Sequence, residues 1–184
     1  MWTSKLLVVV YVLFFLQGTT STQEIEYYRI INKASGKVLD VENGSGDLRA
    51  KIVQFTRQDR SETQQWQIVP FGNFCQVANR KSSYVLDVPN RSIIAGAPLV
   101  LYTSNPNRKD NQNQLWKLNK TKDGYFSLVV LHSNMVLTLE ENSKEDNIKV
   151  IQAKFVGNDT QLWQLESTKS KKASNSKQPP KKKQ

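Results

Sequence analysis

The sequence repeats one triplet three times, a glutamine two residues before a tryptophan: Gln64-Gln65-Trp66, Gln114-Leu115-Trp116 and Gln161-Leu162-Trp163. The successive tryptophans are 50 and 47 residues apart. A second marker recurs with steps of 47 and 51 residues: Val38-Leu39-Asp40-Val41, Val85-Leu86-Asp87-Val88 and Val136-Leu137-Thr138-Leu139. Two markers that recur in the same order at one period indicate three internal repeats.

Each repeat also contains four short segments rich in Val, Ile, Leu and aromatic residues, a pattern typical of β-strands. Turn-forming clusters such as Asn43-Gly44-Ser45-Gly46 separate these segments, and no stretch has a convincing helical period. Twelve strands in three equivalent sets predict a closed all-β barrel with pseudo-threefold symmetry, because closure protects the edges of short strands. The predicted strands are 28–31, 37–41, 52–56, 66–69, 74–78, 84–88, 99–103, 116–118, 125–130, 136–139, 150–154 and 163–165.

The N-terminus carries an apolar run of 11 residues, Leu6 to Leu16, preceded by Lys5 and followed by small and polar residues. This pattern is typical of a secretory signal peptide, which we assign to residues 1–22. A membrane-spanning helix needs about 20 apolar residues, so the run is too short to cross a membrane. We therefore expect a secreted, extracellular protein without a membrane span.

The C-terminal segment, residues 169–184, contains seven lysines, no acidic residue and no large apolar residue. Such a segment cannot bury enough surface to offset its chain entropy, so we predict a disordered tail. Together with Lys5 it accounts for most of the formal net charge of +10 and leaves +2 for the rest. The tail is suited to salt-sensitive attraction of sulfated polyanions, and a purely solubilising tail is the alternative.

Residues 23–168 remain to form the folded domain, as repeats 26–70, 71–121 and 122–168. Cys75 is the single cysteine, so no intrachain disulfide can form. Its alternating apolar neighbours predict a buried thiol. The fold must then be held together by its hydrophobic core.

The three Gln-x-Trp triplets and the Leu-Asp-Val segments before them resemble the ricin B-type lectin family. The resemblance covers residues 26–167 and implies a β-trefoil whose repeats each end in Gln-x-Trp. In that family the tryptophan is a core residue, which implies structural roles for Trp66, Trp116 and Trp163. Sugar-binding repeats of the family supply an aspartate, a stacking aromatic residue and an asparagine beside the triplet glutamine.

The second repeat has all of these residue types: Asp87, Tyr102, Asn113 and Gln114. The resemblance implies that Asp87 accepts hydrogen bonds from two sugar hydroxyls, Asn113 bonds one of them and Tyr102 stacks on the sugar ring. Gln114 would orient Asp87. Structural alternatives remain for most of these residues. Asp87 and Asp40 are also suited to capping the turns that follow their strands, and Tyr102 to being an ordinary strand aromatic. The triplet glutamines are suited to a buried bond between their amide and the backbone.

The other two repeats depart from the family pattern. The first keeps Asp40, Gln54 and Gln64, which we assign to a weaker second site, but has Thr56 at the expected stacking position and Thr63 in place of the asparagine. The third repeat has Thr138, Ala153 and Thr160 at the aspartate, aromatic and asparagine positions, so we expect no sugar site there.

Four Asn-x-Ser/Thr sequons predict N-glycosylation at Asn43, Asn90, Asn119 and Asn158. Asn90 lies three residues after Asp87, so a glycan there would stand close to the second-repeat site. Asn158 lies beside the third-repeat position, where no sugar site is expected.

Chemistry beyond binding has little support in the sequence. His132 is the single histidine and is interpreted as structural; no Asp–His–Ser or Cys–His arrangement can be built around it. We identify no catalytic residues, metal ligands or cofactors and predict that the protein is not an enzyme.

The first functional hypothesis is a secreted lectin that binds galactose-type sugars on glycans or glycoproteins through the second repeat. The second is a trefoil that has lost sugar binding and binds proteins or heparin-like polyanions. A protease-inhibitor trefoil is a third class, without a rigid bridged loop to recommend it. We expect no nucleic-acid partner for a secreted chain, and the oligomeric state is left open.

Overall fold

The computed structural model describes residues 24–107 and 109–169, which form twelve β-strands and five short 3-10 helices. The predicted signal peptide and all of the predicted lysine tail except Lys169 lie outside the described residues. The strands are β1 (Tyr28–Asn32), β2 (Val38–Val41), β3 (Ile52–Phe55), β4 (Trp66–Phe71), β5 (Phe74–Asn79), β6 (Val85–Asp87), β7 (Val100–Tyr102), β8 (Trp116–Lys120), β9 (Phe126–Val130), β10 (Val136–Leu139), β11 (Val150–Ala153) and β12 (Trp163–Ser167).

Five single-turn helices connect the strands: η1 (Glu42–Gly44), η2 (Glu62–Gln64), η3 (Pro89–Arg91), η4 (Gln112–Gln114) and η5 (Asp159–Gln161). Three of them, η2, η4 and η5, end on the triplet glutamine of their repeat. The helices therefore deliver each glutamine side chain to the same place relative to the following tryptophan. None of the described residues forms a helix long and apolar enough to span a membrane.

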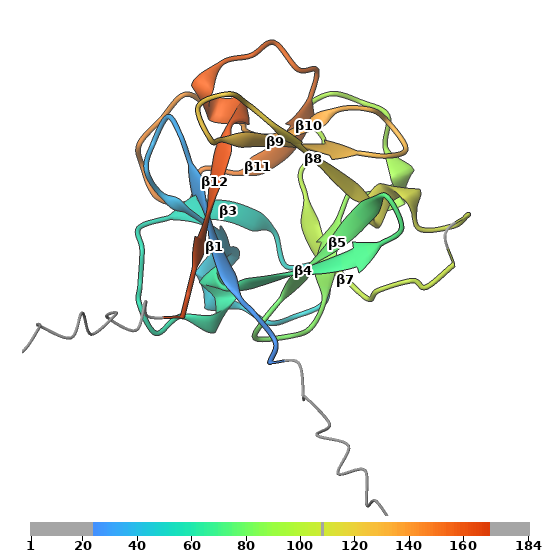
Figure 1. Cartoon of the computed structure of the whole chain (residues 1–184), viewed down its shortest axis with the longest axis horizontal. Helices are drawn as coiled ribbons and strands as arrows, with labels where there is room; N and C mark the ends of the chain where they lie inside the picture. The colour runs from blue at the N-terminus through green and yellow to red at the C-terminus, as the bar shows by residue number, and fades with distance from the viewer. Residues whose placement is uncertain (1–23, 108, 170–184) are drawn as a thin grey trace, which may run out of the picture.

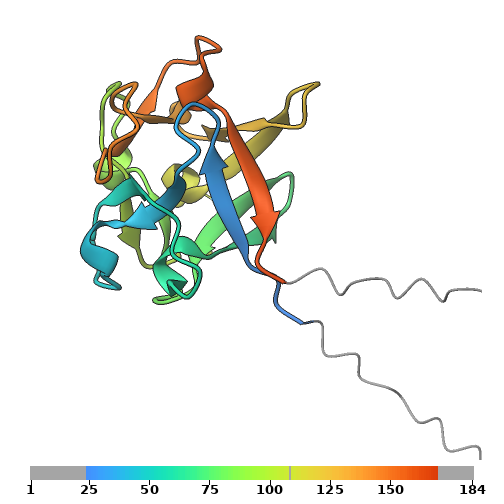
Figure 2. The same cartoon turned by 90° about the vertical axis from the view of Figure 1, so that its left-hand side faces the viewer.

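Six antiparallel strands close into a barrel. β1 pairs with β12, β12 with β9, β9 with β8, β8 with β5, β5 with β4, and β4 returns to β1. The barrel strands β1 and β12 lie side by side, and the ends of the described chain meet where Lys169 Nζ lies 3.0 Å from Glu24 Oε2 (Figure 2). Closure leaves no unpaired edge among these six strands.

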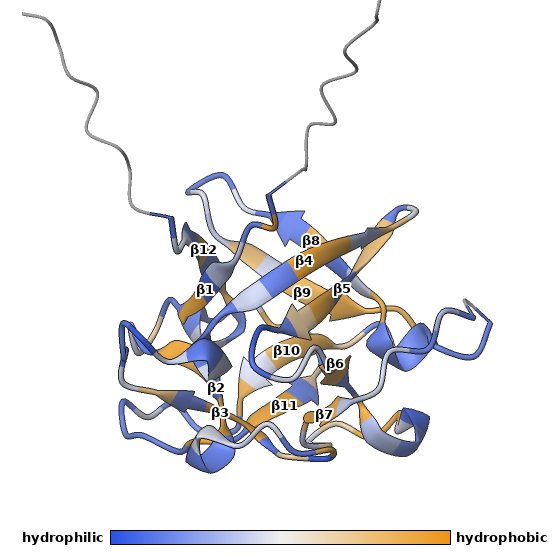
Figure 3. Ribbon diagram, turned by 90° about the horizontal axis from the view of Figure 1, so that it is seen from below, coloured by the Kyte–Doolittle hydropathy of each residue, from blue (hydrophilic) through white to orange (hydrophobic). Residues whose placement is uncertain are grey.

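Three hairpins, β2–β3, β6–β7 and β10–β11, cover the end of the barrel opposite the described chain ends (Figure 3). Each hairpin also touches the next through an isolated bridge: Lys51 with Val100, Pro98 with Ile151, and Lys149 with Val53. The three repeats are arranged around one axis (Figure 1). Each predicted strand segment overlaps one observed strand, and the predicted β-trefoil is confirmed.

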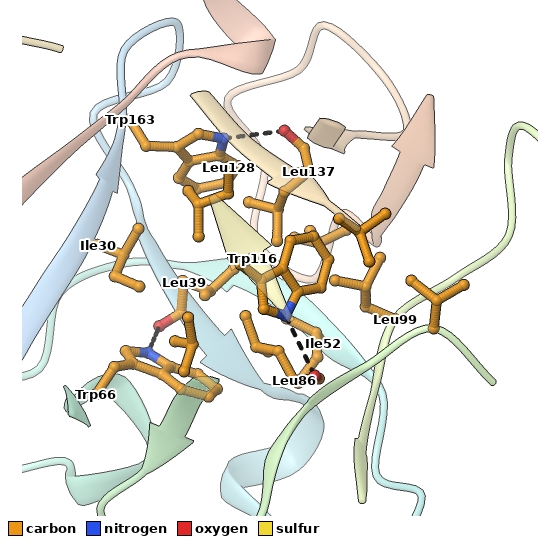
Figure 4. Packing of buried hydrophobic residues seen from close by; sticks show 14 of the residues in the cluster. Ile30, Leu39, Ile52, Trp66, Leu86, Leu99, Trp116, Leu128, Leu137 and Trp163 are labelled. Carbon is orange, nitrogen blue, oxygen red and sulfur yellow. Dashed lines mark hydrogen bonds between the residues drawn. The ribbon is translucent and has the colours of Figure 1, made fainter. Parts of the chain in front are cut away.

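The core lies where the three repeats meet, and Figure 3 shows the apolar strand residues on the inside of the molecule. Trp66, Trp116 and Trp163 are fully buried. Each indole Nε1 donates to the carbonyl oxygen of the leucine in its own Leu-Asp-Val or Leu-Thr-Leu segment (Figure 4): Trp66 to Leu39 at 3.0 Å, Trp116 to Leu86 at 3.3 Å and Trp163 to Leu137 at 3.1 Å. This bond fixes the triplet against the strand that carries the aspartate.

Cys75 is buried in β5, as its sequence context predicts, and its thiol is free. Its Sγ lies 3.4 Å from the carbonyl oxygen of Trp116. Burial raises the pKa of the Cys75 thiol to about 12. The thiol is therefore protonated at neutral pH and serves as a small apolar residue of the core.

The indole bonds predict the effect of removing one of them. Trp163→Phe leaves the buried carbonyl of Leu137 unpaired and leaves a small void, so we expect a loss of about 2–4 kcal/mol in the free energy of unfolding. Denaturant titration measures it. The control Phe155→Ala removes a ring that is 55% exposed and should change stability by less than about 0.5 kcal/mol. Equal losses in the two variants would contradict a structural role for the indole bond.

Candidate functional site

The described residues form a cavity of about 760 Å³ beside the second repeat, which we call the Asp87 cavity. The ends of β6 and β7, the helices η3 and η4, residues 103–106 and Asp110 surround it, with one residue from the first repeat. The lining consists of Arg49, Asp87, Pro89, Asn90, Arg91, Val100, Tyr102, Thr103, Ser104, Asn105, Pro106, Asp110, Asn113 and Gln114. All four residues assigned to sugar binding from the sequence therefore lie in one cavity.

Asp87 ends β6, and two amides hold its carboxylate. Asn113 Nδ2 donates to Asp87 Oδ2 at 2.9 Å, and Gln114 Nε2 donates to the same oxygen at 2.8 Å. Asp87 Oδ1 accepts no hydrogen bond from the described residues, although the side chain is only 4% exposed. One carboxylate oxygen is thus fixed by the protein, while the other accepts no hydrogen bond from the described residues.

The same two amides are anchored to the backbone. Asn113 Nδ2 also donates to the carbonyl of Val88 at 3.1 Å, and Gln114 Nε2 to the carbonyl of Thr103 at 2.9 Å. The amide of Asn105 donates to Gln114 Oε1 at 3.0 Å. All polar atoms of the Gln114 side chain are therefore used within the protein, which makes Gln114 a positioning residue.

Burial raises the pKa of the Asp87 carboxyl above its ordinary value, because the charged form is poorly solvated. The hydrogen bonds from Gln114 and Asn113 and the charges of His132 and Arg49 oppose this shift without cancelling it. The carboxylate is consequently a strong hydrogen-bond acceptor in a partly dehydrated place.

Tyr102 ends β7 and shares the outer face of its hairpin with Asp87. In the β6–β7 register Asp87 is opposite Val100 and Val85 is opposite Tyr102, so the Asp87 and Tyr102 side chains emerge on one face. The Tyr102 ring is half-buried, and the guanidinium carbon of Arg49 lies 5.7 Å from its centroid. The cavity therefore combines an acceptor with an aromatic platform.

The strand register corrects the alignment of the first repeat. Asp40 is opposite Val53 as Asp87 is opposite Val100, and Val38 is opposite Phe55. Phe55, not Thr56, is therefore the equivalent of Tyr102. A constant spacing could have revealed it, because Phe55 follows Asp40 by 15 residues as Tyr102 follows Asp87.

Thr56 and Gln54 have other roles. The carbonyl of Thr56 accepts from Gln64 Nε2 at 3.0 Å, the bond that Thr103 makes with Gln114 in the second repeat. Gln54 is fully buried and does not join Asp40, because its Nε2 donates to the carbonyl oxygens of Ser143 at 2.9 Å and Glu145 at 2.8 Å. Adjacent strand residues point to opposite faces, which explains both differences.

The first repeat thus has Asp40, Phe55 and Gln64 in the positions of Asp87, Tyr102 and Gln114. Gln64 Nε2 donates to Asp40 Oδ2 at 2.8 Å, and the amide of Val41 donates to Asp40 Oδ1 at 2.7 Å. Both carboxylate oxygens are therefore engaged, unlike those of Asp87. Thr63, which replaces the asparagine, is bonded to Ser61, their hydroxyl oxygens 2.8 Å apart.

In the third repeat the polar groups bond one another. Thr138 Oγ1 lies 3.3 Å from Thr160 Oγ1, which donates to Asn158 Oδ1 at 2.8 Å. Ala153 is opposite Val136 in the β10–β11 register, so it stands at the position that Tyr102 has in the second repeat. A cavity of about 430 Å³ is lined by Thr138, Ala153, Thr160 and Gln161, but it has no carboxylate at the Asp87 position.

The predicted glycosylation sites differ in their relation to the cavities. Asn90 lines the Asp87 cavity, and Asn158 lines the third-repeat cavity. Asn43 lies in η1 with φ 57°, as Asn90 does in η3 with φ 56°. Asn119 is exposed on β8. Glycosylation at these four positions stays a prediction.

Neither His132 nor a set of metal-binding side chains adds to the Asp87 cavity among the described residues. His132 Nε2 lies 2.8 Å from the carbonyl oxygen of Ser92. Among the described residues, no three His, Cys, Asp or Glu side chains are grouped to hold a metal ion. The polar chemistry of the second repeat therefore centres on Asp87.

The raised pKa of Asp87 predicts a pH-dependent difference between the wild type and Asp87→Asn. Burial makes Asp87 harder to ionise in the folded protein than in the unfolded chain, whose pKa is about 3.9. The protonated carboxyl therefore contributes to the free energy of unfolding below that pKa, and this contribution is lost as pH rises through the folded-state pKa. The wild type should therefore lose stability relative to Asp87→Asn as pH rises from 3 towards 7, measured by urea denaturation. A difference that favours the wild type more strongly at higher pH would contradict the burial of this carboxyl.

Comparison with known proteins identifies the framework around this cavity. A family model described as ricin-type β-trefoil lectin domain-like matches residues 12–102 and 112–176. No curated protein sequence matches the chain. The crystal structure of a designed threefold-symmetric protein, ThreeFoil, is similar with a TM-score of 0.71 and 36% identity over 76% of this chain and 96% of that chain.

Two natural proteins share the fold. The exo-β-1,3-galactanase of Clostridium thermocellum has a TM-score of 0.72 and 37% identity over 78% of this chain, which covers only 30% of the galactanase. The C-half of the earthworm R-type lectin, in complex with GalNAc, has a TM-score of 0.62 and 17% identity over 77% of this chain and 98% of that chain. Because the family model matches most of its length, the chain belongs to the family of ricin-type β-trefoil lectin domains.

Proposed function

We propose that this protein is a secreted, non-enzymatic lectin that binds a galactose-type sugar in the Asp87 cavity. The observation that carries the proposal is the free Oδ1 of Asp87 beside the Tyr102 ring, in a cavity large enough for a sugar. A sugar offers hydroxyl donors on its edge and an apolar C–H face, and these two features complement a carboxylate and an aromatic ring.

We infer a role for each residue, and the hydrogen bonds within the cavity support these roles. Asp87 Oδ1 accepts from two sugar hydroxyls, and Tyr102 packs against the ring. Both N–H groups of Asn113 are used by Asp87 and Val88, so Asn113 offers its Oδ1 as an acceptor for one hydroxyl. Gln114 contacts Asp87 and not the sugar.

The choice of a galactose-type sugar is supported by two of the similar structures. The galactanase acts on a galactan, and the earthworm lectin was solved with GalNAc. The first repeat provides a weaker second site at Asp40, Phe55 and Gln64. There the sugar must share both Asp40 oxygens with protein donors.

A binding role without catalysis is supported by the carboxylates of the Asp87 cavity. Glycosidases of the common types use a pair of free carboxyl groups. Asp110, the second carboxylate in the lining, lies 3.7 Å from Arg91 Nη2 in an ion pair. Asp87 is therefore left without a free carboxylate partner among the lining residues.

Secretion is supported by the apolar run from Leu6 to Leu16 with its polar flanks. An extracellular lectin also meets glycans and glycoproteins as its partners. The protein would then carry glycans on its own sequons, of which Asn90 is placed to narrow the entrance of the Asp87 cavity.

The double variant Asp87→Ala with Tyr102→Ala tests this assignment. A single shallow sugar pocket has a dissociation constant of about 1 mM, or about −4 kcal/mol, and loss of the acceptor and platform should weaken binding about tenfold or more. Calorimetry with lactose measures it, and a glycan array extends the test to larger ligands. The control is Thr138→Ala, in the repeat that lacks the carboxylate. Unchanged lactose binding in the double variant would remove the assignment.

A second candidate function is polyanion binding by the lysine-rich end of the molecule. Lys117, Lys120 and Lys122 form no ion pair with any described acidic side chain. The strand β8 lies at the same end of the barrel as β12 (Figure 3), and Lys169 follows β12 by two residues. The remaining six lysines of the tail follow Lys169 in the sequence. Heparin-like chains are long enough to contact both groups of lysines.

Truncation after Thr168 tests this second function. We expect the full chain to elute from a heparin column at clearly higher salt than the truncated chain, because each lysine adds a screened attraction. Lactose binding should be the same in both proteins. Elution of both proteins at the same salt concentration would argue against polyanion binding by the tail.

A further inference from the structure

Arg49 enters the Asp87 cavity from a different repeat. It lies in the loop before β3 of the first repeat, yet it lines the cavity of the second. The backbone amide of Arg49 donates to the carbonyl of Leu101 at 2.8 Å, beside Tyr102. The side chain is exposed, and its guanidinium group lies over the Tyr102 ring. The aromatic platform therefore has a cation at its edge.

The backbone conformation at Arg49 is one that favours glycine or asparagine over arginine. Its φ is 68°, in the left-handed region, where glycine and asparagine are favoured. The equivalent residues of the other repeats are Gly96 with φ 93° and Asn147 with φ 63°. Their amides make the same bond, to the carbonyls of Gln152 and Gln54. The first repeat alone places a long cationic side chain on this strained turn.

Arg49 forms no ion pair with an acidic side chain of the described residues, although its charge acts on Asp87 across the cavity. By contrast, Arg91, the other cation of the lining, is paired with Asp110. At the site of the first repeat, the residue equivalent to Arg49 is Asn147 of the third repeat, whose side chain carries no charge. Of the two arginines in the lining, Arg49 is therefore the one without an ion-pair partner among the described residues.

We propose that the Asp87 cavity selects galactose-type sugars that carry an anionic group, a sulfate ester or a carboxylate, and that Arg49 binds this group. The inference rests on the proposed sugar binding and names the class of sugar. The fixed carboxylate of Asp87 repels an anion at its own end of the cavity. The hydroxyls that bond Asp87 are therefore unsubstituted, and the anionic group lies at the edge near Arg49.

The contact between Arg49 and Tyr102 adds a reason for this selectivity. The guanidinium group covers part of the ring, and a neutral sugar that stacks there must displace it without replacing the lost interaction. An anionic group draws the guanidinium into an ion pair, frees the ring and offers a fork-shaped pair of hydrogen bonds. The difference in affinity between neutral and anionic sugars therefore includes the uncovering of the Tyr102 ring as well as the ion pair with Arg49.

The test compares lactose, sulfated lactose and sialyllactose on three proteins by calorimetry at low salt. The test variant is Arg49→Gly, because glycine is the residue that the equivalent turn already uses at Gly96. The control is Arg60→Ala, which removes the same charge from an exposed residue outside the cavity lining. Comparison of the sulfated and sialylated sugars identifies which anionic group the cavity prefers.

We expect the wild type and Arg60→Ala to bind at least one anionic sugar about three- to fivefold more tightly than lactose, the range of a single exposed ion pair. The preference should disappear in Arg49→Gly. It should also shrink in 1 M salt, where the Debye length is about 3 Å. The role of Arg49 would be overturned if the wild type bound lactose as tightly as the anionic sugars, or if the preference survived in Arg49→Gly. Either result would leave the proposed sugar binding intact. Failure of all three sugars to bind the wild type would overturn the proposed function with it.

Discussion

The bond from each buried indole to the carbonyl of the leucine before the aspartate position holds this structure together. It joins the last strand of every repeat to the second, across 26 to 30 residues of sequence, and it occurs three times in one geometry. Because the triplet glutamine stands two residues before the tryptophan, the same bond also sets the glutamine amide beside the aspartate position. Core packing and site geometry are therefore consequences of one contact.

The three repeats show how one frame carries different chemistry. In the second, the amides of Asn113 and Gln114 converge on one oxygen of Asp87 and leave the other free. In the first, the backbone takes the second oxygen of Asp40, and in the third a threonine replaces the carboxylate. In all three repeats the glutamine amide still donates to the backbone carbonyl of the residue immediately after β3, β7 or β11. Its structural role is thus independent of whether a carboxylate is present.

Much of this arrangement could be predicted from the sequence, because repeated markers fix both period and strand order. The strands, the buried tryptophans and the grouping of Asp87 with Asn113 and Gln114 all follow from that period. The position of Phe55 was missed because a shift of one residue exchanges the two faces of a strand, and Gln54 and Thr56 were placed on that shifted register. Arg49 could not be predicted at the second-repeat cavity, because contacts between repeats are not part of the repeated pattern.

We propose that the second repeat holds a sugar ring between Asp87 and Tyr102. The decisive experiment is a crystal structure of the glycosylated protein soaked in lactose. We expect a galactose ring packed on Tyr102, with hydroxyls within hydrogen-bond distance of Asp87 Oδ1. A ring bound only at Asp40, or an Asp87 cavity filled by the protein's own side chains or by the glycan of Asn90, would contradict it.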